Sequence, residues 1–486
     1  MMEENAQKRQ SITLRIPMSL NFAYRSAMFA QDGAYTYLRK PLRPKYQEFL
    51  ELYKQANGEE IRTITDLDAI PAERIDLEFD KCNSYALDAV KQLEAKGYAL
   101  FYNDEPLTIE RMEGLIAANK EIGHKSSFYN RVARIDANLL PDKNGVVYQD
   151  YSDLAVHRDA MLQMDYPIII KSSHGYGGYG ALVVKTPEQL DLALRIIDSP
   201  EFSLRSEHNE DVRKDTFIVE HFHEHARHFA ANVDLRHPDK IYINEEIVSE
   251  VFNLGNQSPQ DLRPEEKTQI EKFIARFIET LDQDGLNYGG YLNFDFISLD
   301  GKVKAIEANP RMSGSLFMNL SSDKSFSSGQ YFYKGNSNYS GKDFFDHIKD
   351  LLFRPSGDGK GMVLSYISQP PGEVEPSFMV VNYADTPEQA KAGLKEKFGK
   401  ESGFVPRVDD KPAFPGYSRG MSHYLRSIPG LMAEYLPEMQ PEGVVSDGNP
   451  LLDADLHYSM PPLESLTHLQ SLGVVNPLSP MQALSS

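Results

Sequence analysis

Cysteine is almost absent from this sequence, because Cys82 is the only one among 486 residues. A single thiol excludes an internal disulfide and any metal site built from several cysteines. The sequence marks no base that would activate this thiol, so we expect Cys82 to be a buried structural residue. The chemistry of the chain must therefore come from other side chains.

Long apolar runs and a basic surplus are also missing. Although 41% of the residues are hydrophobic, no stretch of eighteen apolar residues occurs, so we expect no contact with a membrane interior. The first ten residues are charged and lack the apolar segment of a secretory signal, which predicts a cytoplasmic protein. The formal net charge of -20 disfavours a broad surface for DNA or RNA but is compatible with a local basic pocket for a nucleotide.

The length predicts roughly three packed units, and the alternation of strand and helix patterns predicts an α/β (α+β) fold. We expect an N-terminal α/β domain, then a small unit with a glycine-rich loop, a larger unit, and a C-terminal α/β extension ending in a proline-rich arm. The predicted boundaries of these units are 1–122, 123–216, 217–330 and 331–486.

Local patterns predict individual elements. Asn83 can cap a helix that Gly97 ends, and apolar residues at helical spacing over 270–281 predict a helix that Gly285 ends. A further helix is predicted over 154–164. Strands are expected at residues 11–17, 98–102, 166–171, 181–184, 217–220, 229–235, 240–244, 362–367 and 378–382.

The first motif with chemical meaning is a lysine followed by a glycine-rich loop. The run YPIIIK ends at Lys171, and SSHGYGGYG follows before the apolar residues 181–184. Glycines let backbone N–H groups approach phosphate oxygens, and Lys171 would add a positive charge. The order differs from a P-loop, in which the lysine follows the glycines. A flexible structural hairpin is the competing interpretation.

The second motif is an acidic hairpin. A strand with Asp295 is joined by a tight turn to a strand in which alternation places Glu307 and Asn309 on one face. A three-residue loop would bring Asp295 opposite Glu307 on that face, whereas a two-residue loop would pair Asp295 with Ile306 and turn it away. Two carboxylates and an amide oxygen on one face suit Mg²⁺, and a surface hairpin with solvated acids is the alternative.

The third motif is the strand FIVEHF at residues 217–222. Such a strand can offer backbone groups to the edge of a purine while Glu220 accepts a hydrogen bond from the purine's amino group. An ordinary buried strand is the competing interpretation.

The order and spacing of these three motifs resemble the ATP-grasp superfamily, and within it the biotin carboxylase-like branch of carboxylate–amine ligases. The resemblance covers residues 125–320 and implies that the two middle units are the small and large subdomains of an ATP-grasp fold. It also implies ATP and Mg²⁺ as cofactors, with Mn²⁺ as an alternative cation.

The resemblance assigns roles to residues of the motifs. Lys171 and an earlier lysine would bind phosphates; Lys125 fits the second role best, and Lys120 competes with it. The implied nucleotide-binding residues are Lys125, Lys171, Gly175, Gly177, Gly178, Gly180, Glu220, His221, Phe222 and His228. The implied metal ligands are Asp295, Glu307 and Asn309, the catalytic residues are Arg311 and Lys171, and the substrate contacts are Arg311, Ser313 and Gly314.

The implied reaction is formation of an amide from a carboxylate and an amine through an acyl phosphate, with release of ADP and phosphate. Biotin-dependent carboxylases carry a basic Gln-Arg-Arg-His-Gln-Lys run after the purine-binding strand, where this chain has NEEIVSE at 244–250, so carboxylase chemistry is disfavoured. Glu245, Glu246 and Glu250 are candidates to recognise a cationic amine, and a solvated acidic face is the alternative.

Two other functions stay open at this stage. One is a bicarbonate-phosphorylating or other phosphoryl-transfer enzyme, and the other is a non-catalytic ATP-binding module. The expected partners are small-molecule carboxylate and amine substrates, with no nucleic acid and no membrane, and a homodimer is left open.

Overall fold

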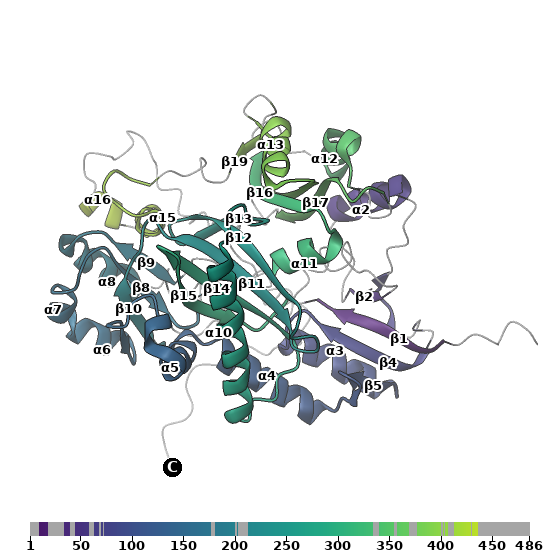
Figure 1. The fold of residues 1–486 in the computed structure, drawn as a ribbon, viewed down its shortest axis with the longest axis horizontal. Coiled ribbons are helices and arrows are strands. Elements are labelled where there is room, and N and C mark those ends of the chain that lie inside the picture. Colours follow the sequence, from purple (N-terminus) through teal and green to yellow (C-terminus); the bar gives the residue numbers. More distant parts are fainter. Residues whose placement is uncertain are drawn as a thin grey trace, which may run out of the picture.

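The computed structural model consists of three sheets with helices packed around them (Figure 1). It describes residues 9–17, 34–38, 44–57, 63–67, 70, 72–175, 180–199, 202, 212–333, 340–353, 357–368, 377–399, 402, 404–406, 413–428 and 430–435. No helix in these ranges is both long enough and apolar enough to cross a membrane.

The N-terminal sheet is parallel except for its last strand, and its order is β3-β2-β1-β4-β5-β6. Helices α3 (Ser84–Ala95) and α4 (Ile109–Gly123) follow its later strands. Asn83 caps α3 as predicted, accepting a 3.1 Å hydrogen bond from the backbone of Ala86, and Gly97 leaves the helix with φ +82°. The strands are β1 (Arg9–Ile16), β2 (Tyr35–Tyr37), β3 (Thr63–Ile64), β4 (Ala72–Phe79), β5 (Ala99–Tyr102) and β6 (Glu105–Pro106).

A second, antiparallel sheet of four strands has the order β7-β10-β8-β9. Its strands are β7 (Val146–Tyr148), β8 (Ile168–Ser172), β9 (Ala181–Val184) and β10 (Phe217–His221). The helices of this unit are α5 (Lys125–Asp136), α6 (Tyr151–Val156), α7 (Arg158–Met161) and α8 (Leu190–Asp198). The apolar side of α8 lies against the sheet in a core of its own.

The predicted helix over 154–164 is wrong in its continuity, because α6 ends before His157 and α7 begins after it. The ring Nδ1 of His157 lies 2.8 Å from the carbonyl oxygen of Asp153, closer than the 3.3 Å from its own backbone nitrogen. This side chain therefore competes with the backbone for the carbonyl that would continue the helix.

The largest sheet is antiparallel and runs in the order β15-β14-β11-β12-β13-β16-β18-β17, with β19 paired to β16. Its strands are β11 (Arg227–Asp234), β12 (Ile241–Ser249), β13 (Phe252–Gln257), β14 (Tyr291–Leu299), β15 (Lys302–Asn309), β16 (Ser325–Tyr333), β17 (Gly361–Ser368), β18 (Ser377–Ala384) and β19 (Phe404–Pro406). Helix α10 (Pro264–Gln283) packs on this sheet and ends before Gly285, which has φ +68°. Helix α11 (Gly314–Ser321) follows β15.

Segments distant in sequence complete the outer parts of the molecule. Helix α2 (Pro44–Asn57) packs beside α12 (Gly341–Ile348), and α13 (Pro387–Lys397) covers β16 and β18. Helices α15 (Arg419–Ser427) and α16 (Leu431–Tyr435) return to β9 and α8, on the left in Figure 1. Short 3₁₀ helices occur at η2 (Ala137–Leu139), η3 (Pro187–Gln189), η4 (Val212–Lys214) and η5 (Lys349–Leu351).

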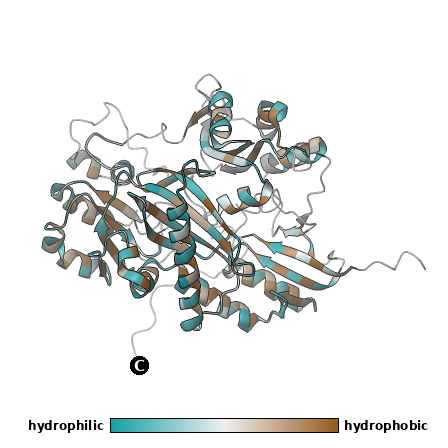
Figure 2. Ribbon diagram, in the orientation of Figure 1, coloured by the Kyte–Doolittle hydropathy of each residue, from teal (hydrophilic) through white to brown (hydrophobic). Residues whose placement is uncertain are grey.

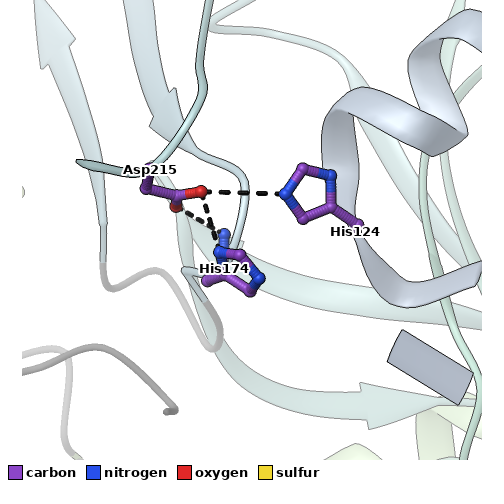
Figure 3. Close-up of side chains that lie close together, drawn as sticks. All are labelled: His124, His174 and Asp215. Atoms are coloured by element: carbon purple, nitrogen blue, oxygen red, sulfur yellow. Dashed lines mark hydrogen bonds and ion pairs between the residues drawn. The ribbon is translucent and has the colours of Figure 1, made fainter. Parts of the chain in front are cut away.

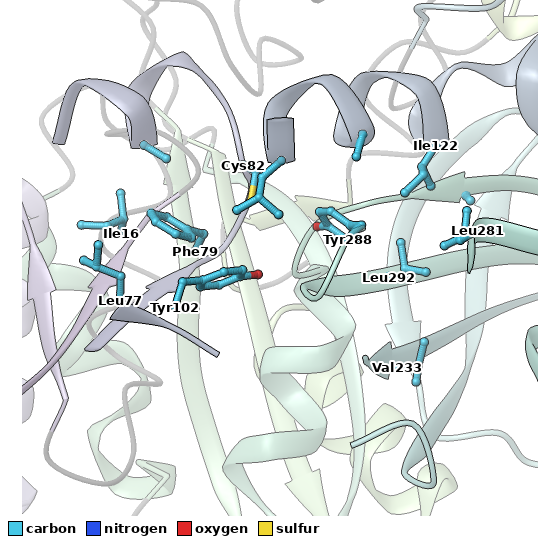
Figure 4. Close-up of a cluster of buried hydrophobic side chains, with 14 of the residues drawn as sticks. Ile16, Leu77, Phe79, Cys82, Tyr102, Ile122, Val233, Leu281, Tyr288 and Leu292 are labelled. Atoms are coloured by element: carbon cyan, nitrogen blue, oxygen red, sulfur yellow. The ribbon is translucent and has the colours of Figure 1, made fainter. Parts of the chain in front are cut away.

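One hydrophobic core joins the N-terminal sheet to the large sheet. Cys82, Tyr102 and Tyr288 lie in this core with residues of both sheets (Figure 4). Cys82 is buried as predicted, and burial raises the pKa of its thiol to about 12. The side of α10 seen in Figure 2 is mostly hydrophilic, while its apolar residues enter the core. The N-terminal unit and the large sheet are thus fixed to each other.

Strands β13 and β16 approach each other so closely at Gly255 that a side chain there is not accommodated. A Cβ atom at this position would lie 2.3 Å from the backbone oxygen of Ser328, which cannot move without disturbing the sheet. We expect Gly255→Ala to lower the free energy of unfolding by about 1–3 kcal/mol. The control is Gly114→Ala on the exposed side of α4, where no atom lies within 4 Å, and which should raise it by about 0.5–1 kcal/mol. Urea unfolding followed by circular dichroism measures both, and equal effects would contradict this account.

Candidate functional site

A cavity of about 340 Å³ lies between the four-stranded sheet and the large sheet. It is bounded by the start of α5, by β8 and β10, by the face formed by β11 to β15, and by the start of α11. Every predicted site residue that the structure describes lines this cavity. They are Lys125, Lys171, Gly175, Gly180, Glu220, His221, Phe222, His228, Asp295, Glu307, Asn309, Arg311, Ser313 and Gly314. Gly177 and Gly178 lie outside the described residues.

The acidic hairpin places Asp295 directly opposite Glu307 on β14 and β15. The turn has two residues, Asp300 and Gly301, both with positive φ, so the expectation that a two-residue loop would pair Asp295 with Ile306 is wrong. A β-bulge adds Ile306 to β15 and shifts the pairing by one residue. The bulge thus achieves what the longer loop would have done.

The two carboxylates share hydrogen-bond donors. The Asn309 side-chain nitrogen lies 3.1 Å from Asp295 Oδ2 and 3.0 Å from Glu307 Oε1, and Lys125 Nζ lies 2.9 Å from Glu307 Oε2. Lys125 also donates to the carbonyl oxygen of Gly175 in the glycine loop. Lys120 lines the same cavity, but Lys125 is the lysine that contacts both the acids and the loop.

The pKa values of these two carboxyl groups are shifted in opposite directions. Burial raises the pKa of Asp295 well above its usual range, and the negative charges of Glu246 and Glu307 raise it further. Burial also acts to raise the pKa of Glu307, but the positive charge of Lys125 and the hydrogen bonds with Asp295, Asn309 and Lys125 together outweigh it and lower the pKa to about 2. Adjacent carboxylates with an amide beside them form the hard-oxygen donor set that binds Mg²⁺, and a divalent cation would let both ionise.

Lys171 and Glu220 form a buried ion pair in the cavity wall. Lys171 is on β8 and Glu220 on the neighbouring β10, and their exposed fractions are 6% and 2%. The second carboxylate oxygen of Glu220 has no hydrogen-bond partner among the described residues. A buried acceptor without a partner beside a cavity is suited to a ligand donor.

The backbone of β10, the strand expected to contact a purine, is arranged differently from the expectation. The N–H of His221 donates to the Asp142 carboxylate at 3.1 Å, and the N–H of Phe222 donates to the Pro167 carbonyl at 2.8 Å. These two N–H groups therefore do not face the cavity as hydrogen-bond donors. His228 does line the cavity, and burial lowers its pKa to about 4, so its imidazole is neutral at pH 7.

The base of the glycine loop is held by a cluster that the sequence motifs did not reveal (Figure 3). Asp215 accepts from the ring Nδ1 and the backbone N–H of His174, each at 2.8 Å, and from the hydroxyl of Ser172. His124 Nε2 lies 3.7 Å from the same carboxylate. Burial raises the pKa of Asp215, but the hydrogen bonds from His124 and His174 outweigh it and the pKa is lowered. Because so many protein donors already surround this carboxylate, we interpret it as an anchor for the loop.

Arg311 lies in a turn fixed by the N-terminal unit. Arg311 pairs with Lys81 in an isolated bridge, and the hydroxyl of Tyr288 donates to the carbonyl of Pro310 at 3.0 Å. Ser313 caps α11 through a 3.1 Å hydrogen bond from the backbone of Leu316, so its hydroxyl is used structurally. Gly314 is the first residue of that helix.

Comparison with known families supports the fold. Residues 124–318 match the family described as carbamoyl-phosphate synthase L chain, ATP binding domain. This segment has the ATP-grasp fold that the motifs predicted, with an N-terminal parallel α/β sheet before it. No curated protein matches the chain.

Solved structures similar to this chain are distant in sequence. An N5-carboxyaminoimidazole ribonucleotide synthetase with ADP is 14% identical, with a TM-score of 0.49 over 80% of this chain and 96% of that chain. The biotin carboxylase domain of the Hydrogenobacter thermophilus 2-oxoglutarate carboxylase, with MgADP and bicarbonate, is 13% identical, with a TM-score of 0.48 over 81% and 90%. Phosphoribosylamine–glycine ligase of Thermotoga maritima is 12% identical, with a TM-score of 0.48 over 82% and 98%.

The anchor at Asp215 should stabilise the protein in a pH-dependent way. Its folded-state pKa is below that of the unfolded chain, so its stabilisation is present above about pH 4 and is lost as the pH falls further. We expect Asp215→Asn to lower the free energy of unfolding by about 1.5–3 kcal/mol at pH 7, with a smaller difference from wild type in acid. Asp239→Asn, at an exposed turn, is the control. A difference that does not change with pH would contradict the charged anchor.

The buried pair of Lys171 and Glu220 should contribute to stability as a unit. Lys171→Met leaves a buried carboxylate without its cation and should destabilise the fold by about 3–5 kcal/mol. Adding Glu220→Leu removes that charge, so the double variant should recover most of the loss. Urea unfolding of the two single variants and the double variant measures the coupling, and additive losses would contradict a direct ion pair.

Proposed function

We propose that this protein is an ATP-dependent ligase that joins a carboxylate to an amine through an acyl phosphate. The observation that carries the proposal is the direct pairing of Asp295 with Glu307, in contact with Lys125 and Asn309, in the cavity that Arg311 also lines. The match of residues 124–318 to an ATP binding domain supports ATP as the nucleotide.

The residues of the cavity have different roles in the proposed reaction, and their charge determines these roles. Lys125 and Lys171 bind and orient the nucleotide phosphates, and the glycine loop excludes water from the reactive intermediate. Asp295, Glu307 and Asn309 would hold Mg²⁺, or Mn²⁺ in its place, which neutralises phosphate charge when bound. Arg311 stabilises negative charge on the reacting carboxyl group; losing one such donor typically costs about 3 kcal/mol of transition-state stabilisation.

The proposed reaction consists of two successive displacements. A carboxylate oxygen attacks the γ-phosphorus, the bond to the β-phosphate oxygen breaks, and ADP leaves with the electron pair. The amine nitrogen then attacks the acyl carbon, the bond to the phosphate oxygen breaks, and phosphate leaves with that electron pair. The ammonium ion gives one proton to water before this attack and the nitrogen loses a second proton after it, so carboxylate, ammonium ion and ATP become amide, ADP, phosphate and a proton.

One wall of the cavity supports an amine as the second substrate. Glu246, Asn253 and Asn256 line the cavity on β12 and β13, and none of these side chains is cationic. A second anion would be unfavourable at this wall, because burying an unpaired anion costs free energy, whereas an ammonium ion would be paired with Glu246.

The direct test is release of ADP from ATP in the presence of paired panels of small carboxylates and amines, with products identified by mass spectrometry. We expect release that requires both an acid and an amine. Hydroxylamine in place of the amine should trap the acyl phosphate as a hydroxamate. Turnover with bicarbonate alone would instead indicate a carboxylase-like enzyme, and nucleotide binding without turnover would indicate a binding module.

Glu307 provides the decisive substitution. We expect Glu307→Ala to reduce metal-dependent ATP turnover at least about 100-fold with an unchanged circular dichroism spectrum, because the carboxylate shared by Lys125 and Asn309 is lost. Asp300→Asn, in the turn of the same hairpin, is the matched control and should retain activity. Full turnover by Glu307→Ala would refute the metal assignment.

A further inference from the structure

Three acids near the end of β12 were equal candidates from the sequence, and the structure separates them. Glu245 is engaged away from the cavity, with Arg227 Nε at 3.5 Å and the Gln257 amide at 3.1 Å. Glu250 also lines the cavity, but it accepts from the backbone N–H of Arg419 and lies 3.6 Å from the cation of Lys185. Glu246 lines the cavity and accepts a hydrogen bond from Asn253, which is a neutral side chain.

Glu246 faces the cavity together with Asn256. These residues are directly opposite each other on the antiparallel strands β12 and β13, so their side chains lie on the same face. The carboxylate of Glu246 accepts a 2.6 Å hydrogen bond from the Asn253 amide. The backbone N–H of Asn256 donates to the hydroxyl of Ser328 at 2.8 Å, and that hydroxyl donates back to the Asn256 carbonyl at 3.0 Å. The pair is therefore held in place before any ligand arrives.

The side-chain oxygen of Asn256 is an acceptor without a hydrogen-bond partner among the described residues. Asn256 is only 8% exposed, and an unsatisfied buried acceptor typically costs about 1–3 kcal/mol. A fold that retains such a group at a cavity wall has a place for a ligand that donates a hydrogen bond. Together with the carboxylate of Glu246, this oxygen favours a donor that is positively charged.

The surroundings limit the size and character of that ligand. Met318 and Met379 line the same cavity and are almost fully buried, which provides an apolar wall for a short carbon chain. Arg311 also lines the cavity, and its charge acts on Glu246. Burial and the charge of Glu307 raise the pKa of Glu246 to about 7, and a bound cation would favour its ionised form.

We propose that Glu246 and Asn256 form the acceptor subsite of this enzyme, in which a small primary amine binds as its ammonium ion beside Arg311. Glu246 supplies the opposite charge and Asn256 accepts a hydrogen bond from the same nitrogen. This inference rests on the proposed ligase function, because it names the class of the second substrate. It assigns the specificity for amines to residues outside the acidic hairpin and the glycine loop.

The kinetic test compares two nucleophiles in Glu246→Gln, using the acid and amine found by the ADP-release panel. Hydroxylamine is neutral at pH 7.5 and reports formation of the acyl phosphate, whereas the amine reports the acceptor subsite. We expect KM for the amine to rise at least tenfold while hydroxamate formation stays within about twofold of wild type. Glu245→Gln, on the other face of β12, is the matched control and should change neither. An unchanged KM for the amine, or equal loss of both products, would overturn the subsite.

A binding measurement separates this inference from the proposed function. Saturation-transfer NMR with ethanolamine as the probe, in the presence of ADP, needs no turnover. We expect a signal with wild type and Glu245→Gln that is lost in Glu246→Gln. If no acid supports hydroxamate formation but this pattern holds, the ligase function falls while the cation subsite stands. If turnover requires an amine but ethanolamine binds equally to all three proteins, the subsite falls while the ligase function stands.

Asn256→Leu tests the unsatisfied acceptor by a different quantity. Removing a buried acceptor that has no partner should leave the thermal midpoint unchanged or higher. The same variant should raise KM for the amine several-fold, because the ligand loses a hydrogen bond. A lower midpoint with an unchanged KM would show that Asn256 serves the fold and not the acceptor.

Discussion

The contact on which the site depends is the cross-strand pairing of Asp295 with Glu307. A tight two-residue turn alone would have placed Ile306 opposite Asp295 and turned one carboxylate away from the cavity. The bulge in β15 changes the register and brings the two acids together. Burial and the neighbouring carboxylates then raise the pKa of Asp295, while Lys125 helps to keep Glu307 ionised. A cation held between them would resolve this repulsion, which is why the hairpin suits a divalent metal.

Several other charges in and around the cavity have partners from other parts of the chain. Lys171 is paired with Glu220, and Asp215 holds the base of the glycine loop through His174. The loop of Arg311 is fixed from the N-terminal unit, whose core is continuous with that of the large sheet. Such pairs keep the buried charges compensated. The fold thereby presents an organised cavity between two sheets.

Local order was largely predictable, because it depends on neighbouring residues. The cap at Asn83, the helix stops at Gly97 and Gly285, and most strands follow from spacing and turn chemistry. The prediction of one continuous helix around His157 was wrong because the His157 side chain competes for the carbonyl oxygen of Asp153. The spacing of apolar residues carries no information on this competition. The anchor made by His124, His174 and Asp215 was missed because its members come from separate elements and share no spacing in the sequence.

The sequence by itself determined the order of the motifs, and with it the ATP-grasp fold of residues 124–318, because residue type and spacing specify strands, turns and glycine loops locally. Only the tertiary structure decided which of three neighbouring acids lines the cavity with a neutral hydrogen-bond partner. Pairing across β12 and β13 points Glu246 and Asn256 to one side, while Arg227 and Gln257 engage Glu245 and the backbone of Arg419 engages Glu250. Alternation along a strand gives each residue a face, but the packing of other elements determines what that face contacts.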